Sequence, residues 1–180
     1  MSESEKFLRN AMDTYGNSVY RLALCRLQNV ADAEDIFQDV FLCLIKEKDA
    51  MQWGLDHMKA WLLRVTINKC NNLARSMIKR RVLPLTEIPE LASEITQSDN
   101  KLWEAIGYLP VKFRNVILLY YVEGYKTEEI SGILKCPAAT VRSRLHRGRN
   151  QLKKMIGGIL NEERLQRYDG ENQSSECIER

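Results

Sequence analysis

The sequence has little that marks a secreted or membrane-embedded protein. Its longest uninterrupted apolar run covers seven residues, Val116 to Val122, whereas a helix that crosses a bilayer needs about 18 or more. The first six residues are polar and partly acidic, so we predict no signal peptide. We therefore expect a cytoplasmic protein with no membrane insertion.

Cysteine and histidine are too scattered to indicate a disulfide framework or a metal site. The five cysteines form an odd count with no short spacing, which argues against a C-x-x-C zinc site. His57 and His146 lie far from any cysteine along the chain. We expect no metal and no cofactor, and we expect reduced cysteines that pack as small apolar side chains. These are Cys25, Cys43, Cys70, Cys136 and Cys177.

The common catalytic motifs are also missing. There is no G-x-x-x-x-G-K phosphate loop, no G-x-G-x-x-G fingerprint and no G-x-S-x-G nucleophile turn. Because no acid–base or nucleophile arrangement is visible either, the sequence predicts a protein that is not an enzyme.

What the sequence does contain is an uneven distribution of charge. Hydrophobic residues make up 44% and charged residues 28%, as is ordinary for a globular protein. The net charge of +3 conceals two segments, 59–81 and 132–154, each with seven basic residues and no acidic one, so the rest of the chain carries −11. Two such segments favour two separate contacts with a polyanion, although a charge run is more often just a solvated face.

Hydrophobic periodicity is helical nearly throughout, with no convincing strand, so the predicted fold class is all-α. Long amphipathic helices are expected at 5–27, 32–46 and 58–81. Shorter helices are expected at 102–109, 110–122, 127–134 and 137–155.

The amino-acid composition changes between these two groups of helices. Pro84, Pro89 and the polar stretch 93–99 indicate a linker. We therefore predict two small helical domains joined by a linker, and a polar tail for which the sequence suggests no role. The predicted limits are 1–81 for the first domain, 82–100 for the linker, 101–160 for the second domain and 161–180 for the tail.

The second domain has the pattern of a helix-turn-helix. Thr127 can cap a helix, and Lys135-Cys136-Pro137 predicts a tight turn, with Pro137 as the first residue of the next helix. On that helix the apolar face is Val141, Leu145, Gly148 and Leu152. The opposite face is Arg142, Ser143, His146 and Arg147, with Arg144 and Arg149 on the flanks. Such a face suits the DNA major groove; a basic solvated helix on an ordinary bundle is the alternative.

The helix at 58–81 presents aromatic, amide and basic residues together. Its inward side is predicted to be Leu62, Leu63, Thr66, Ile67, Cys70, Leu73, Ala74 and Met77. Its outward side gathers Trp61, Arg64, Val65, Asn68, Asn72, Arg75 and Lys79. Rings can stack on bases, amides can bond base edges and cations can follow the backbone, so this face suits single-stranded or unpaired DNA. Trp61 could equally be a rim residue of the core.

The helix at 32–46 has an acidic face. Its inward side is Ala33, Ile36, Phe37, Val40, Phe41 and Leu44, and its outward side is Asp32, Asp35, Gln38, Asp39 and Leu42. An acidic face with an exposed leucine cannot bind DNA, but it can dock on a basic protein surface. A metal site at Asp32, Asp35 and Asp39 is conceivable by spacing, yet no histidine or further ligand set converges there.

Two other classes of protein explain less of the sequence. One is a stand-alone helix-turn-helix regulator, whose first domain senses a ligand or dimerises. It leaves two surfaces unexplained: the acidic face of the helix at 32–46, and the outward side of the helix at 58–81, called the Trp/Asn face after Trp61, Asn68 and Asn72. An enzyme that acts on nucleic acid lacks a visible constellation of catalytic groups.

Three ordered motifs resemble bacterial sigma factors of the sigma-70 family. Residues 32–41 (DAEDIFQDVF) resemble the motif of region two that binds core polymerase, and 60–68 (AWLLRVTIN) are similar to its promoter-melting segment. The stretch from Leu109-Pro110 through Glu128-Glu129-Ile130 to 140–149 (TVRSRLHRGR) resembles region four. The resemblance covers about 150 of the 180 residues. With only two domains and a short linker, the chain resembles the extracytoplasmic-function (ECF) subfamily.

The resemblance implies a promoter-specificity factor that directs core RNA polymerase to its promoters. It implies that Asp35, Gln38, Asp39 and Leu42 dock on the clamp helices of the largest subunit, with the flap as a further contact. Trp61, Arg64, Asn68, Asn72, Arg75 and Lys79 would open and read the minus-ten element as single strand. Arg142, Ser143, Arg144, His146, Arg147 and Arg149 would read the minus-thirty-five element as duplex. The linker would thread toward the polymerase active-site channel, and an anti-sigma factor is an expected partner.

Overall fold

The computed structural model describes residues 2–80 and 97–156, and every regular element in these ranges is helical. The predicted all-α fold class is therefore confirmed. The chain divides into two compact units, Met1–Glu90 and Leu91–Arg180. The predicted tail 161–180 and most of the predicted linker lie outside the described residues. The last four residues of that predicted linker belong to a helix that begins at Gln97.

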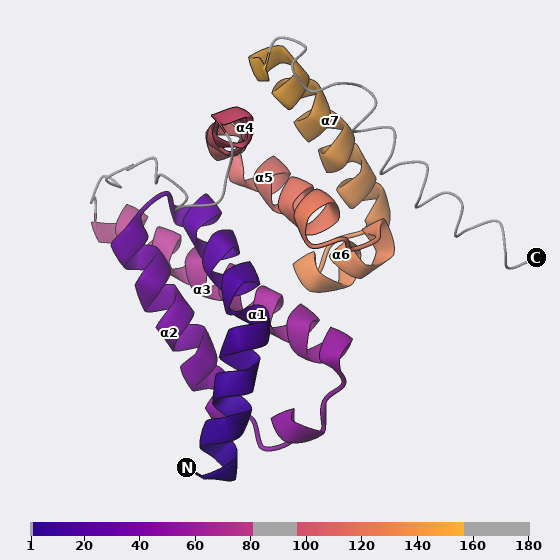
Figure 1. The fold of residues 1–180 in the computed structure, drawn as a ribbon. Coiled ribbons are helices and arrows are strands. Elements are labelled where there is room, and N and C mark those ends of the chain that lie inside the picture. The colour runs from indigo at the N-terminus through magenta and orange to yellow at the C-terminus, as the bar shows by residue number, and fades with distance from the viewer. Residues whose placement is uncertain (1, 81–96, 157–180) are drawn as a thin grey trace, which may run out of the picture. The chain divides into compact units, whose positions relative to one another are not determined.

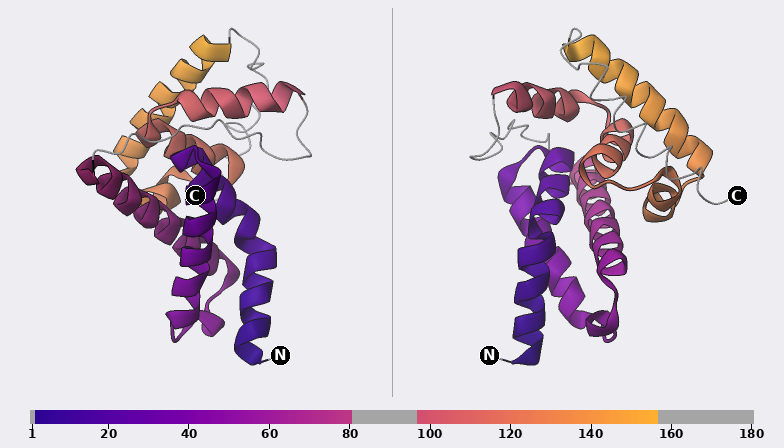
Figure 2. Two further views of the ribbon diagram at one scale, coloured as in Figure 1. Left: turned by 90° about the vertical axis from the view of Figure 1, so that its left-hand side faces the viewer. Right: turned by 45° about the vertical axis from the view of Figure 1, so that its right-hand side comes forward.

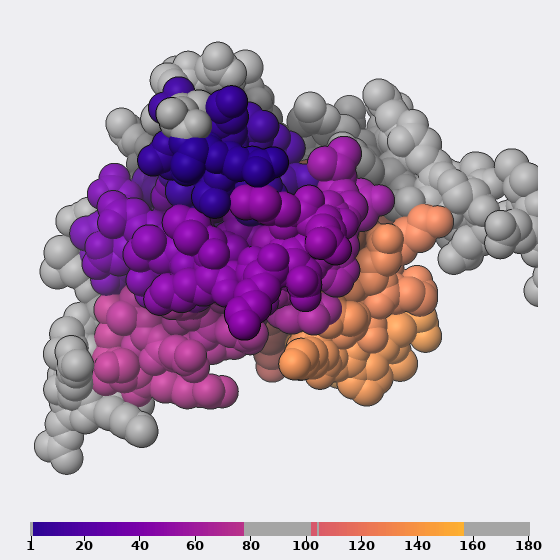
Figure 3. Space-filling view, turned by 90° about the horizontal axis from the view of Figure 1, so that it is seen from below, coloured from indigo at the N-terminus to yellow at the C-terminus, as the bar shows by residue number. Residues whose placement is uncertain are grey.

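The first unit is a bundle of three long helices (Figure 1). They are α1 (Glu3–Leu27), α2 (Val30–Lys46) and α3 (Leu55–Arg80), with a short 3-10 turn η1 (Ala50–Gln52) before α3. Each of the three helices contacts the other two, and the space-filling view shows them as one continuous surface (Figure 3). The core side chains with no solvent exposure include Val19, Val40, Leu44, Leu62 and Leu63.

Side-chain caps start the first two helices of this unit. Ser2 Oγ accepts from the backbone N–H of Glu5, and the Glu5 carboxylate accepts from the N–H of Ser2 at 2.7 Å. Asn29 Oδ1 accepts from the N–H of Asp32 at 2.8 Å and starts α2. Only Gln28, in the left-handed region at φ 52°, and Asn29 separate α1 from α2. This short turn makes α1 and α2 neighbours in the bundle.

The second unit is built around its last helix. It contains α4 (Gln97–Tyr108), α5 (Val111–Ile117), a π-helical turn η2 (Leu118–Val122), α6 (Thr127–Leu134) and α7 (Ala138–Ile156). The single helix predicted at 110–122 is thus an α-helix followed by a π turn, in which the N–H of Glu123 bonds to the carbonyl of Leu118. Figures 1 and 2 show α7 running across α5 and reaching α4 and α6.

A close approach at Gly148 sets how α7 lies on α5. A methyl group added at Gly148 would stand 3.1 Å from Ile117 Cγ1 and 3.3 Å from Phe113 Cβ. These distances are shorter than ordinary van der Waals contact. The absence of a side chain at Gly148 therefore allows the two helices to pack closely, in agreement with its predicted position on the apolar face.

We predict that Gly148→Val destabilises the second unit by about 1–3 kcal/mol, because a branched side chain has to push α7 away from α5. Hydrogen exchange of the amides in α5 and α7 should speed up accordingly. Gly132 of α6 is the matched control, since nothing lies within 4 Å of a methyl group added there. Gly132→Ala should slow exchange, by about 0.5–1 kcal/mol of added stability. Unchanged protection in Gly148→Val would contradict the close approach.

Candidate nucleic-acid interfaces

The residue that caps the first helix of the helix-turn-helix lies one position before Thr127, the predicted cap. Thr127 is the first helical residue of α6, and Lys126 occupies the cap position. The Glu129 carboxylate reaches back and accepts from the backbone N–H of Lys126 at 2.7 Å. The hydroxyl of Thr127 instead donates to the carboxylate of Glu128.

The turn between α6 and α7 consists of the three residues predicted for it. Lys135 adopts φ 50° and ends α6. The hydroxyl of Ser131 donates to the carbonyl of Cys136 at 2.7 Å and holds the turn. The carbonyl of Pro137 accepts from the N–H groups of Thr140 and Val141. The prediction that Pro137 is the first residue of α7 is therefore wrong by one position. Pro137 precedes the helix, because its carbonyl accepts the first helical hydrogen bonds.

The two predicted faces of α7 are present. Val141, Leu145, Gly148 and Leu152 are buried against the unit, whereas Arg142, Ser143, His146 and Arg147 are exposed. The flanking Arg144 and Arg149 are half-buried, and the guanidinium of Arg144 lies 3.8 Å from Cys136 Sγ. The segment from Arg142 to Arg147 thus presents basic and polar groups to the solvent.

The side chains of the exposed α7 face already have neighbours. The hydroxyl of Ser143 donates to the carbonyl of Thr140 at 3.0 Å. His146 Nε2 lies 3.1 Å from Asn150 Nδ2. Arg142 Nη1 lies 3.3 Å from Glu128 Oε1 of α6. Neighbouring groups of the same unit therefore restrain part of this face.

In the first unit, α3 carries the predicted Trp/Asn face on one side, but its members differ in exposure. Asn68, Asn72 and Arg75 are exposed, whereas Trp61 and Arg64 are half-buried. The side chain of Lys79 lies outside the described residues.

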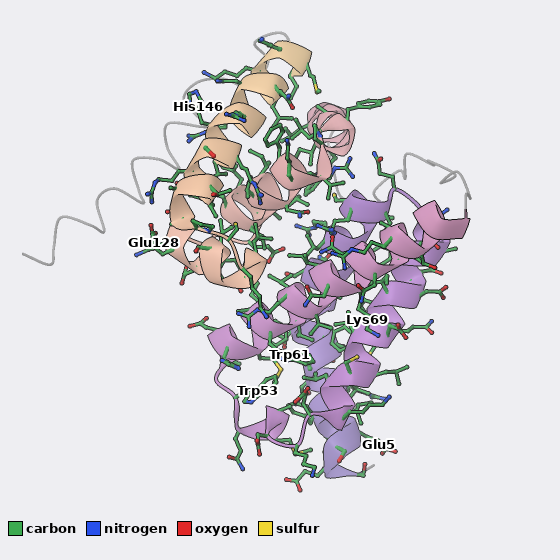
Figure 4. The ribbon with its side chains drawn as sticks, turned by 180° about the vertical axis from the view of Figure 1, so that it is seen from behind. Glu5, Trp53, Trp61, Lys69, Glu128 and His146 are labelled. Carbon is green, nitrogen blue, oxygen red and sulfur yellow. The ribbon has the colours of Figure 1, made fainter. Side chains whose placement is uncertain are left out.

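Trp61 belongs to an aromatic cluster that sequence reasoning missed. Its ring centroid lies 5.3 Å from that of Trp53, which follows η1, and Trp53 lies 4.9 Å from His57 (Figure 4). The regular four-residue spacing of Trp53, His57 and Trp61 was the available signal. The cluster restricts how the Trp61 ring can turn, and it keeps one side of that ring out of water.

The inward face of α3 is shorter than predicted. Thr66, Ile67 and Cys70 are buried, but Ala74 is exposed, contrary to the prediction. The reason is that α1 does not extend as far as Ala74. Arg26, which contacts Asn71 of α3, is the last residue but one of α1, whereas α3 continues to Arg80.

A buried polar contact fixes α3 against the end of α1. Arg26 Nη2 donates to Asn71 Oδ1 at 2.7 Å, and Arg26 is only 8% exposed. Burial lowers the pKa of Arg26, and burial raises the pKa of the neighbouring Cys70 thiol to about 11, although Arg26 opposes this rise. Asn71 directly precedes the exposed Asn72, so this contact anchors the backbone beneath the Trp/Asn face.

The acidic face of α2 is exposed as predicted at Asp35, Gln38, Asp39 and Leu42, and Asp32 is half-buried. Burial, followed by the charge of Asp35, raises the pKa of Asp32. Leu42 is 53% exposed and Ile45, one turn further on, is 50% exposed. The face therefore combines carboxylates with an apolar patch.

An ion pair connects this acidic face to α3. Lys69 Nζ lies 2.8 Å from Asp39 Oδ2, and this hydrogen bond raises the pKa of Lys69 (Figure 4). Lys69 is one of the seven basic residues of segment 59–81. In the structure it contacts α2 and does not extend the Trp/Asn face.

Disulfides, metal sites and membrane-spanning helices are all absent from the described ranges. The four cysteines in these ranges form no disulfide, and Cys25 and Cys70 are buried. Within 2–80 and 97–156 there is no group of three His, Cys, Asp or Glu residues that could hold a metal ion. No helix in these ranges is long and apolar enough to cross a membrane.

Two helical units, one with a helix-turn-helix whose second helix exposes a basic face, are typical of DNA-binding proteins. Comparison with known proteins narrows this class. Residues 11–81 match the family model of sigma-70 region 2, and residues 99–152 match that of sigma-70 region 4. The chain belongs to the sigma-70 family of RNA polymerase sigma factors, in its ECF subfamily.

Individual relatives agree with this assignment. The ECF RNA polymerase sigma factor SigE of Mycolicibacterium smegmatis is 33% identical over an alignment of 153 residues, which covers 77% of this chain and 57% of SigE. The ECF RNA polymerase sigma factor SigW of Bacillus subtilis is 28% identical over an alignment of 162 residues, which covers 81% of this chain and 86% of SigW. The chain thus spans little more than half the length of SigE but most of SigW.

Among solved structures, the sigma factor RpoE from Bartonella quintana, in complex with the anti-sigma factor NepR, has a similar fold. Its TM-score is 0.68 at 22% identity, and the match covers 84% of this chain and 98% of that chain. At this identity the likeness concerns the fold alone.

Proposed function

We propose that this chain directs core RNA polymerase to promoters through three surfaces on its two units. The observation that carries the proposal is the separation of charge: α2 presents carboxylates around an exposed leucine, whereas α7 presents Arg142, Ser143, His146 and Arg147. Family membership makes the chain a transcription initiation factor, and the surfaces supply a physical route to that function.

The α7 face is proposed to read the minus-thirty-five element as duplex. A helix presented by a helix-turn-helix fits the major groove, where arginine can donate two hydrogen bonds to guanine. Arg142, Ser143, His146 and Arg147 are the proposed reading residues. The half-buried Arg144 and Arg149 are proposed to contact phosphates, which position the helix on the duplex.

The Trp/Asn face of α3 is proposed to open and hold the minus-ten element. Extruding a base costs a few kcal/mol, and stacking together with amide hydrogen bonds can offset this cost. Trp61, Arg64, Asn68 and Asn72 are the proposed base-holding residues. Arg75 and Lys79 are proposed to follow the strand backbone.

The α2 face is proposed to dock on the clamp helices of the polymerase largest subunit through Asp35, Gln38, Asp39 and Leu42. Its carboxylates repel DNA and attract a basic protein surface, and its exposed leucine adds apolar area at the centre of the contact. The second unit is proposed to contact the flap. Because this partner works in the cytoplasm, the chain is proposed to act there.

Control by an anti-sigma factor is part of the proposal. RpoE, the structural neighbour, is held in complex with the anti-sigma factor NepR. A protein that covers either the α2 face or the α7 face would remove one of the contacts needed at a promoter.

The decisive experiment is run-off transcription on genomic promoter fragments, with a gel-shift assay in parallel, each with and without bacterial core polymerase. We expect specific transcripts and stable promoter complexes only when polymerase is present. Tight, sequence-specific binding by the chain alone, without new transcripts, would instead indicate a stand-alone regulator.

Leu42→Glu should weaken binding of core polymerase by about tenfold, because it replaces apolar contact area with another carboxylate. The fold should be retained, since Leu42 is 53% exposed. Leu55→Glu is the matched control, because Leu55 is 75% exposed and lies outside the α2 face. Fluorescence anisotropy with labelled chain measures both affinities. Equal affinities for the two variants would count against the α2 face.

Arg147→Ala should lower transcription from the cognate promoter by about tenfold at limiting protein, as expected when one arginine–base contact is lost. Arg9→Ala provides the control, since it removes the same charge from an exposed position of α1. An unchanged transcript yield with Arg147→Ala would refute its place in the reading face.

A further inference from the structure

An ion pair joins the two helices of the helix-turn-helix. Glu128 of α6 and Arg142 of α7 approach to 3.3 Å, and their side chains are 63% and 60% exposed (Figure 4). Glu128 is not among the residues predicted or proposed to touch DNA. It is nevertheless in contact with one that is.

The carboxylate of Glu128 is held by its own helix. The Thr127 hydroxyl lies 2.9 Å from both carboxylate oxygens and donates to them. This hydrogen bond, together with the backbone N–H of Glu128, lowers the pKa of Glu128, so the group is ionised at neutral pH. A carboxylate in the first turn also suits the positive end of a helix. Glu128 is therefore an ionised acceptor, held by Thr127, that lies 3.3 Å from Arg142.

The contact leaves Arg142 able to bond elsewhere. A guanidinium is planar and carries five N–H donors, and the contact with Glu128 uses Nη1. The Nη2 and Nε groups point along other directions of the same rigid fork. A long arginine side chain loses much rotamer freedom when it binds, and prior orientation reduces that cost.

The negative charge of Glu128 has the opposite effect on DNA binding in general. A carboxylate beside a reading helix repels phosphates and lowers the affinity that does not depend on sequence. Glu128 should thus raise the preference for one base pair, by orienting Arg142, and lower the affinity for DNA of any sequence, by repelling phosphates. Removing a residue that merely stabilised the fold would lower both the preference and the affinity.

We propose that Glu128 is a positioning residue that orients Arg142 toward a base edge, sharpening the preference at one base pair while weakening sequence-independent binding. The inference rests on the proposed function, in which Arg142 reads the minus-thirty-five duplex. It adds a residue, Glu128, that lies outside the reading face and influences the base preference of that face.

The test uses the full chain with core polymerase on a promoter library that is randomised across the minus-thirty-five element. Arg142→Ala first identifies the base pair whose preference depends on Arg142. In Glu128→Ala, we expect the preference at that base pair to fall about two- to fivefold, the range that an exposed ion pair supports. Preferences at the other positions should stay unchanged, and binding of random duplex by the chain alone should become tighter.

Two further variants separate orientation from charge. Glu129→Gln removes the same charge from the same helical turn, and its amide oxygen can still accept from Lys126, so binding of random duplex should tighten without loss of base preference. Glu128→Gln keeps an oxygen that can accept from Arg142 and should restore part of the lost preference.

Three results would overturn the inference. They are an unchanged base preference in Glu128→Ala, an equal loss at all positions, or no base pair whose preference depends on Arg142. If wild-type chain directs specific transcripts while either of the first two results is found, only the inference fails. The third result would also refute the place of Arg142 in the reading face. If wild-type chain gives no polymerase-dependent transcript, the proposed function itself fails.

Discussion

The rotation of each helix about its own axis decides which side chains the chain offers to a partner, and burial sets that rotation. In α7 the constraint is sharpest at Gly148, where Ile117 and Phe113 leave no room for a side chain. Turning α7 by one position would bring Arg147 or Arg149 into this contact and bury an uncompensated charge, which costs several kcal/mol. The exposure of Arg142 and Arg147 therefore follows from packing on the far side of the helix.

In the first unit, burial likewise determines which side chains are exposed on two helices of opposite charge, α2 and α3. Burial of Val40 and Leu44 leaves the carboxylates of α2 outside, and burial of Leu62 and Leu63 leaves the amides and cations of α3 outside. Lys69 is the exception, because this cation of α3 bonds to Asp39 of α2 and does not extend the Trp/Asn face. That pair is exposed and contributes little to stability; its effect is to fix the position of one carboxylate on the acidic face.

Helical periodicity was sufficient to predict the fold class, the helices to within a few residues of their ends, and the faces of α2 and α7. It failed where one segment meets another. A helical wheel shows one helix at a time, so it could not show that α1 stops beside Asn71 and leaves Ala74 exposed, or that Trp53 packs on Trp61. The starts of α6 and α7 were misplaced by one residue, at Thr127 and Pro137, because the carbonyls of Lys126 and Pro137 accept the first helical hydrogen bonds. The roles of individual site residues stay predictions.

The proposed surfaces are individually small, and this sets where specificity can arise. One exposed helical turn on α7 and a half-buried tryptophan with two asparagines on α3 offer few contacts each, so either unit alone should bind DNA weakly. When polymerase holds both units at the spacing of a promoter, the second contact becomes effectively intramolecular and the affinities combine. The acidic α2 face then has a physical purpose besides docking, since its charge keeps DNA off the surface that polymerase needs. Selection of a promoter would thus belong to the assembled complex, in which each weak contact contributes only when the others are correctly placed.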